Sequence, residues 1–433
     1  MVNIKRIKKR TRRQVDHQVS KIRSGGLSAV FVLARGVVIT TIGLFLNLLA
    51  TFIAIPVAIV VRLFRPIILI RVGYFDARRM GHFAVDLGTH LVENDLGNNN
   101  KSIKDLIFFK GVPTNNHLAK IGKREFFVIP VAKYLWLANR ILPFGKSHTL
   151  VPAIESTNSR DTRGLFYQSD AKFAFTPDEE LSGREFLKEV GLANCERFVC
   201  LNARDGAYLD QFFGDSQWDY HSYRDVNVEN YRLSAAYLAE KGYGVVRMGK
   251  TVKEAFGVNH PLIFDYGASP YRSDFLDVWL MANCFFCVSN GTGLDSVADI
   301  FRVPTVMVDF IPLTHLHTWQ EAITMPKHLL WNEKNRELVL SEVLQCGYFR
   351  TDEYDRAGID VVNLSPEEIL SVVSEMELRL TTKIKEEPSH IERQAEFWKI
   401  FRQHSCFDKY HDFIHPKNRF SQYYLEKNPA WLN

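Results

Sequence analysis

The sequence predicts an α/β protein in which two strand-and-helix units follow an N-terminal membrane-associating segment. The chain has 433 residues, which is more than one ordinary core holds and enough for two domains. From residue 66 onward, short β-branched apolar runs alternate with amphipathic segments, a pattern typical of parallel α/β units. Residues 37–61 contain no charge, and ~20 apolar residues are enough to cross a bilayer.

The composition is globular, with 46% hydrophobic and 24% charged residues. The net charge of +5 is a local property, because nine Lys and Arg precede Gly25 against the single acid Asp16. The rest of the chain is slightly acidic, which excludes a uniformly basic nucleic-acid surface. Six cysteines do not make a disulfide framework. Cys284 and Cys287 form a C-x-x-C inside an apolar run, so we interpret them as buried rather than as metal or redox residues.

The uncharged segment 37–61 is too long for the apolar region of a signal peptide, and no small-residue cleavage site follows it. Both of its flanks are basic, since Arg62 and Arg65 follow at once. We therefore expect residues 1–65 to form a basic arm and a membrane anchor, with the body of the chain on the cytoplasmic face of the inner membrane. A single transmembrane pass and a buried core helix are the alternatives.

The first α/β unit is predicted over residues 66–185. Strands are expected at 67–72, 106–109 and 126–129, with a helix at 81–93. A helix at 176–192, opened by Thr176 and Pro177, links it to the next unit. The second unit is predicted over 190–375, and a helical tail over 376–433.

The second unit has five predicted strands, and polar residues gather where these strands end. In open α/β sheets, ligands bind outside the carboxyl ends of the strands. After the fourth strand comes the turn "SNGTG", followed by a helix. Its glycines permit positive φ and close ligand approach, and its hydroxyls add donors, which together predict a phosphate cradle. The residues are Ser289, Gly291, Thr292, Gly293 and Ser296; a plain strand-to-helix turn is the alternative.

Two phosphate chemistries compete for this turn. The dinucleotide fingerprint is nearly matched, but its third glycine is Ser296 and the turn lies late in its unit, which argues against an NAD-dependent enzyme. Cations at the strand ends and at the next helix start instead suit a nucleotide diphosphate, with Asp295 placed for a ribose or sugar hydroxyl. These cations are Arg204, Arg247, Lys250 and Arg272. No metal-binding motif accompanies them in the sequence.

The blocks "RVGYFDARRMGHFAVD", "FVCLNARDGAYL", "GYGVVRMGK" and "RSDFLDVWLMANCFFCVSNGTGLDSVADIFRVPTVMVDF" resemble a family of bacterial glycosyltransferases found with surface-polysaccharide genes. The resemblance covers about residues 67–331. It implies the GT-B class, in which two Rossmann-like domains face a cleft, the C-terminal one holding the nucleotide sugar and the N-terminal one the acceptor. It implies His82 or Asp76, with Asp205 as a further candidate, as the base that deprotonates the acceptor hydroxyl.

The sequence thus predicts a metal-independent glycosyltransferase that moves a sugar from a nucleotide-activated donor to a glycan or lipid-linked acceptor. The expected partners are that donor, that acceptor and the membrane, and no cofactor beyond the nucleotide sugar is expected. An NAD-dependent sugar-modifying enzyme, a pyruvyl-transferase-like enzyme and a non-catalytic sugar-binding protein are the alternatives. The sugar, the base, the stereochemical course and the oligomeric state stay open.

Overall fold

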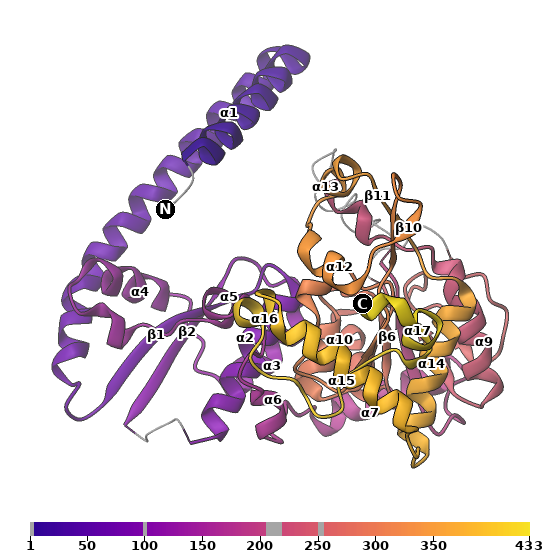
Figure 1. Cartoon of the computed structure of the whole chain (residues 1–433). Helices are drawn as coiled ribbons and strands as arrows, with labels where there is room; N and C mark the ends of the chain where they lie inside the picture. Colours follow the sequence, from indigo (N-terminus) through magenta and orange to yellow (C-terminus); the bar gives the residue numbers. More distant parts are fainter. Residues whose placement is uncertain (1–3, 98–101, 205–218, 250–254) are drawn as a thin grey trace. The chain divides into compact units, whose positions relative to one another are not determined.

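The computed structural model describes residues 4–97, 102–204, 219–249 and 255–433 (Figure 1). It divides into two compact units. Unit 1 comprises Met1–Val72 and Val131–Thr149, and unit 2 comprises Gly73–Pro130 and Leu150–Asn433. Most of the segment expected to form a separate acceptor domain therefore belongs to the same compact unit as the C-terminal domain.

Unit 1 is built on the long helix α1, Ile4–Leu63, which contains Pro56. Its part Ala34–Leu63 is long and apolar enough to cross a membrane, with a mean hydropathy of 2.6 over its most apolar window. Helix α4, Ala132–Ile141, packs against α1, and the single turn η1, Gly145–His148, follows it. Residues 131–149 were expected within the acceptor domain, but the structure groups them with the anchor.

The N-terminal sheet is small. Its two strands are β1, Leu69–Asp76, and β2, Ile103–Lys110, and isolated parallel bridges join Val72 to Thr149 and Ile107 to Val128. The helices of this part are α2, Met80–Asp95; α3, Asn116–Glu125; α5, Ala153–Ser156; α6, Leu165–Gln168; and α7, Pro177–Glu189. Helix α7 begins with the expected cap, because Thr176 and Glu179 form a capping box.

Unit 2 contains a seven-stranded sheet in the order β12-β8-β7-β6-β3-β4-β5. Every neighbouring pair is parallel, which confirms the α/β class. Two strands, β8 and β12, were not predicted. The strands are β3, Phe198–Asn202; β4, Gly244–Arg247; β5, Ile263–Phe264; β6, Cys287–Ser289; β7, Thr305–Met307; β8, Ala322–Thr324; and β12, Arg419–Phe420.

Alternate residues of each strand enter two separate cores, one on each face of the sheet. On β3, Val199 and Leu201 join one core, and Phe198 and Cys200 join the other. This is why the strands read as continuous apolar runs. The first core includes α9, Arg232–Glu240; α14, Pro366–Thr381; and α15, Pro388–Gln403. The second includes α2, α10, Asp274–Asn283, and α11, Asp295–Phe301, with the buried, free Cys284 and Cys287.

The expected helical tail is not separate from the sheet. Its strand β12 extends the sheet beside β8, and its aromatic residues enter the first core. A second, antiparallel sheet, β10-β9-β11, also went unpredicted: β9, His328–Trp331; β10, Arg336–Glu337; and β11, Ile359–Val362. The remaining elements are α12, Leu340–Cys346; α13, Thr351–Arg356; α16, Cys406–Tyr410; α17, Gln422–Lys427; and the single turns η2, Asp219–Arg224; η3, Val228–Tyr231; η4, Leu313–His315; and η5, Pro429–Leu432.

Candidate functional site

The strand order of the large sheet reverses between β3 and β6. The chain runs outward from β3 through β4 to β5, then returns to the other side of β3 for β6, β7 and β8. At this reversal the last residues of the two strands, Asn202 and Ser289, are register partners. In open α/β sheets the crevice at such a switch point is where ligands bind. The predicted glycine turn follows β6 directly and therefore lies at this switch point.

The turn is held by the carboxylate of Asp295. That carboxylate accepts hydrogen bonds from the Ser289 hydroxyl, from Asn202 Nδ2 at 3.1 Å, and from both the backbone N–H and the hydroxyl of Thr292, at 2.6 and 3.1 Å. Gly291 adopts φ +81°, a conformation that favours glycine. Four converging donors fix the loop between the strand and helix α11.

Asp295 was expected to contact a ribose or sugar hydroxyl, and the structure corrects this expectation. The residue is 0% exposed, and its hydrogen bonds go to the turn itself. Ser289 is likewise fully buried and donates to Asp295. Burial raises the pKa of Asp295 to about 6 against its hydrogen bonds, which favour the charged form. Both residues position the turn, and Thr292 and Ser296 remain partly exposed beside it.

We expect Asp295→Asn to lower the free energy of unfolding by ~1–3 kcal/mol, because an amide cannot accept all four hydrogen bonds. The raised pKa sets the pH dependence. The folded pKa is about 6 and the ordinary value 3.8, so protonation stabilises the wild type at low pH, and that contribution is lost as pH rises through 6. The variant lacks this titration. The difference in unfolding free energy between wild type and variant should therefore be larger at about pH 5 than at about pH 8. Urea unfolding at both pH values checks this; an equal cost would contradict the assigned titration.

Helix α2 reaches the turn through a glycine-to-glycine contact. A Cβ placed on Gly293 would lie 3.0 Å from the backbone nitrogen of Gly81, and a Cβ on Gly81 would lie 3.2 Å from the Ser296 hydroxyl. Two turns further along, a Cβ on Gly88 would lie 2.4 Å from Ile300 of α11. Gly293 was expected to allow a ligand to approach the backbone. In the structure, its missing side chain also allows the start of α2 to approach the turn closely. Helix α11, which follows the turn, has seven residues.

This contact places His82, in the first turn of α2, beside the glycine turn. Its Nδ1 is hydrogen bonded to the Ser159 hydroxyl at 2.8 Å, which orients the half-buried ring. Burial, then the charge of Arg79, lowers the pKa of His82, so the ring is neutral near pH 7. Ser159 and its neighbour Asn158 have φ values of 57° and 55°, an uncommon conformation that clusters at functional sites.

Asp76 is a weaker candidate base than the resemblance implies. Arg78 donates to both carboxylate oxygens of Asp76, at 2.8 and 2.6 Å. The hydrogen bond from Arg78 lowers the pKa of Asp76 below its ordinary value. A carboxylate in this state accepts a proton poorly near neutral pH. Asp205, the third candidate base, lies outside the described residues.

Three cations, of which sequence analysis predicted Arg204 alone, lie close to Gly291 and Asp225. Arg224 donates to the carbonyl of Gly291, and Arg204 donates from Nε to Asp225 at 3.0 Å. Lys327 is buried and donates to the carbonyl of Asp225 at 2.6 Å. Burial, together with the charges of Arg204 and Arg224 and against nearby carboxylates, lowers the pKa of Lys327 to about 8. Mutually repelling cations favour the binding of an anion.

Two of the expected donor-binding cations are engaged elsewhere. Arg247 is 1% exposed and donates to both oxygens of Asp265, at 3.2 Å each. Asp265 in turn accepts from the backbone of Phe256, so this pair fixes the edge of the sheet. Arg272 pairs with Asp277 at 3.1 Å. These contacts favour structural roles for Arg247 and Arg272, and Lys250 lies outside the described residues.

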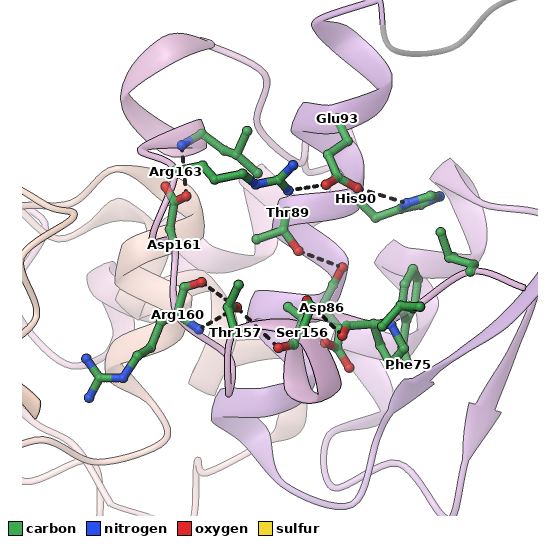
Figure 2. A pocket seen from close by; sticks show the side chains of 15 residues that line it. Phe75, Asp86, Thr89, His90, Glu93, Ser156, Thr157, Arg160, Asp161 and Arg163 are labelled. Carbon is green, nitrogen blue, oxygen red and sulfur yellow. Dashed lines mark hydrogen bonds and ion pairs between the residues drawn. The ribbon is translucent and has the colours of Figure 1, made fainter. Parts of the chain in front are cut away.

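A polar pocket is lined on one side by helix α2 (Figure 2). Asp86, Thr89 and Glu93 line it at four, seven and eleven residues after His82, the spacing of one helical face. Asp86 accepts the backbone N–H groups of Asp76 and Ile154, and burial raises its pKa to about 7. The opposite wall is the segment 150–165, which also carries Ser159.

No group of three or more His, Cys, Asp or Glu side chains in the described part of the chain is arranged to hold a metal ion. The expectations for metal and cofactor rest on sequence alone.

The comparisons with known proteins bear on this architecture. No protein-family model matches the chain, and no curated protein matches it. Among solved structures, it is similar to the glycosyl transferase family 9 protein from Veillonella parvula DSM 2008: 12% identity, 72% of this chain, 98% of that chain, TM-score 0.41. It is also similar to the E. coli ADP-heptose LPS heptosyltransferase II: 14% identity, 72% and 100% covered, TM-score 0.39. E. coli heptosyltransferase WaaC with ADP-2-deoxy-2-fluoro heptose gives 13% identity, 55% and 88% covered, TM-score 0.29. At these values no residue role can be transferred to the chain.

Proposed function

We propose that the chain is a glycosyltransferase that moves a sugar from a nucleotide diphosphate donor to a hydroxyl of a glycan or lipid-linked acceptor. One observation carries the proposal: the Gly81–Gly293 contact brings a neutral histidine to the glycine turn at the switch point of a parallel sheet. A candidate base on one side of the turn and a cation cluster on the other are the two groups that sugar transfer needs.

The chemistry follows from these two sides. His82 takes the proton of the acceptor hydroxyl on Nε2, because Nδ1 is occupied by Ser159. The hydroxyl oxygen forms the new bond to the anomeric carbon, and the bond from that carbon to the diphosphate oxygen breaks. The nucleoside diphosphate leaves with the electron pair, and Arg204, Arg224 and Lys327 stabilise its charge. The nucleotide sugar is the co-substrate, and no other cofactor takes part in this scheme.

The acceptor is proposed to occupy the polar pocket along α2. The pocket shares its helical face with His82 and is lined by hydroxyl, carboxylate and guanidinium groups, which suit a sugar. The domain boundaries predicted at residues 66–185 and 190–375 remain proposals, as does the location on the cytoplasmic face of the membrane. That location is supported by the basic arm before the apolar segment.

A ligand panel tests the donor class on the full chain in detergent. The panel holds UDP, GDP, ADP, CDP, CMP and NAD. We expect one of the four nucleoside diphosphates to raise the melting temperature, since ligand at 100 times Kd adds ~2.7 kcal/mol. Arg204→Ala should abolish the shift. Arg336→Ala removes a surface cation that pairs with Glu342 and should leave the shift intact. A shift with NAD alone would replace the proposal by an NAD-dependent enzyme, and no shift with any nucleotide would contradict it. A shift without hydrolysis or transfer would indicate a sugar-binding protein.

A further inference from the structure

Helix α4 covers one stripe of α1, and many of the other side chains between residues 34 and 63 are exposed. The stripe consists of Asn47, Thr51, Ala54, Ala58 and Arg62. Thr51, Ala54 and Ala58 are small and buried, which allows the two helices to approach closely. Asn47 accepts a hydrogen bond from the Tyr134 hydroxyl at 3.1 Å, and Arg62 donates to Asn139 and to the carbonyl of Pro143.

The surface of unit 1 is apolar and basic at the same time. Large side chains on the uncovered faces of α1 are exposed, among them Phe45, Phe52 and Ile53. Besides the nine cations before Gly25, unit 1 carries seven more Lys and Arg, while Asp16 is its one acid. The remainder of the chain is net acidic. A second copy of unit 1 is a poor partner for this surface, because two such basic units repel each other.

The loop after α4 exposes an aromatic side chain that would be expected to be buried in a protein surrounded only by water. Phe144 is 90% exposed and has φ +60°, so a bulky aromatic side chain is held in a strained conformation without being buried. Ile141 and Val131, at the end of α4 and just before it, are also exposed. Lys133 lies over the Tyr134 ring at 4.6 Å and Arg140 over the Trp136 ring at 4.7 Å. Aromatic rings beside cations are typical of the membrane–water interface.

We propose that α4 and Phe144 are a second membrane-docking element, and that unit 1 lies in one leaflet of an anionic bilayer without crossing it. The length of the uncharged helix outside the α4 contact argues against a crossing. Upstream of the α4 contact at Asn47, the uncharged part of α1 begins at Val37 and is about ten residues long, which spans about 15 Å. The hydrocarbon core is about 30 Å thick. Crossing would therefore carry α4, with Lys133, Asn139 and Arg140, into the hydrocarbon.

A fluorescent probe on residue 144 tests the docking. The full chain carries Phe144→Cys with the half-buried Cys195 and Cys346 replaced by Ser, and an environment-sensitive dye is attached. In vesicles of phosphatidylglycerol and phosphatidylcholine we expect the dye emission to shift to the blue. Lipids that carry a nitroxide at a shallow depth in the bilayer should quench that emission. The same dye at Leu181→Cys, an exposed apolar position on α7 of unit 2, should be unaffected. No quenching at 144, or a shift that depends on protein concentration without lipid, would overturn the proposal.

A labelling experiment tests the topology. Ser24→Cys and Ser147→Cys lie before and after the uncharged segment, in the same Cys195 and Cys346 background. In right-side-out membrane vesicles of the expression host, an impermeant maleimide should label both positions only after the vesicles are opened. Labelling of one position, but not the other, in intact vesicles would show a crossing and overturn the proposal. Neither readout requires transferase activity, so its outcome is independent of the proposed function.

Discussion

His82→Asn is expected to lower the rate of sugar transfer by ~10²–10⁴-fold while leaving nucleotide affinity unchanged. Asparagine keeps a polar group within reach of Ser159 but cannot take a proton near neutral pH. The cations proposed to bind the donor contact Asp225 and Gly291, and none of these contacts involves the His82 ring. Steady-state transfer with the nucleotide sugar found in the panel, together with a nucleotide titration, measures both quantities.

The pH profile separates a base from a structural residue. The pKa of His82 is lowered from 6.5, so the neutral ring, and with it activity, should be lost only as pH falls through a value below 6.5. His82→Asn should lack that acidic limb. Asp76→Asn is the control, since Asp76 is already paired with Arg78. A His82→Asn enzyme with the wild-type rate, or an Asp76→Asn enzyme with the larger loss, would reassign the base.

Gly293→Ala is expected to reduce transfer by ~10²-fold, although alanine adds a single methyl group. The new Cβ would lie 3.0 Å from the backbone nitrogen of Gly81 and 3.4 Å from the Met80 Cβ. Neither atom is the end of a flexible side chain, so the first turn of α2 must move and carry His82 with it. Gly81→Ala should act in the same direction, because its Cβ meets the Gly293 Cα at 3.3 Å.

Gly244→Ala is the matched control for this crowding. Its Cβ would meet the Phe198 Cβ at 3.2 Å, at the start of β4 and therefore at the opposite end of the strand from the site. All three variants should lower the free energy of unfolding by a similar amount, ~1–3 kcal/mol for an overpacked contact. Only the variants at Gly293 and Gly81 should lose activity. Equal activity losses in all three would mean that the glycine contact has a structural role alone.

Regular elements with strong local signals could be predicted from the sequence. The central strands β3, β4, β6 and β7 are apolar on both faces, and Thr176 caps its helix as expected. Strand β12 was missed because Arg419 and Phe420 lie between Asn418 and Ser421 and show no apolar run, and β8, Ala322–Thr324, was also missed. Helix α4 is amphipathic, but nothing local indicates that it packs on α1 rather than on the first sheet.

The sequence predicted where the glycine turn lies in the sheet, but not the contacts that its residues make. Asn202, Ser289 and Thr292 lie together because parallel strands end at one edge. The roles of Asp295 and Arg247 differ from the expectation because spacing does not show burial, and both side chains are buried with partners of their own. Lys327 was missed because only the fold brings it to Asp225, about a hundred residues earlier in the chain.

The most direct test is a crystal structure of the full chain with the nucleotide that the panel identifies. The account predicts that the diphosphate lies at the turn 291–294, at the carboxyl ends of β3 and β6, between the Arg204–Arg224–Lys327 cluster and His82. The phosphate that carries the sugar should be the one nearer to His82. A nucleotide bound away from this turn, or bound there with His82 on the far side of a closed wall, would contradict the account.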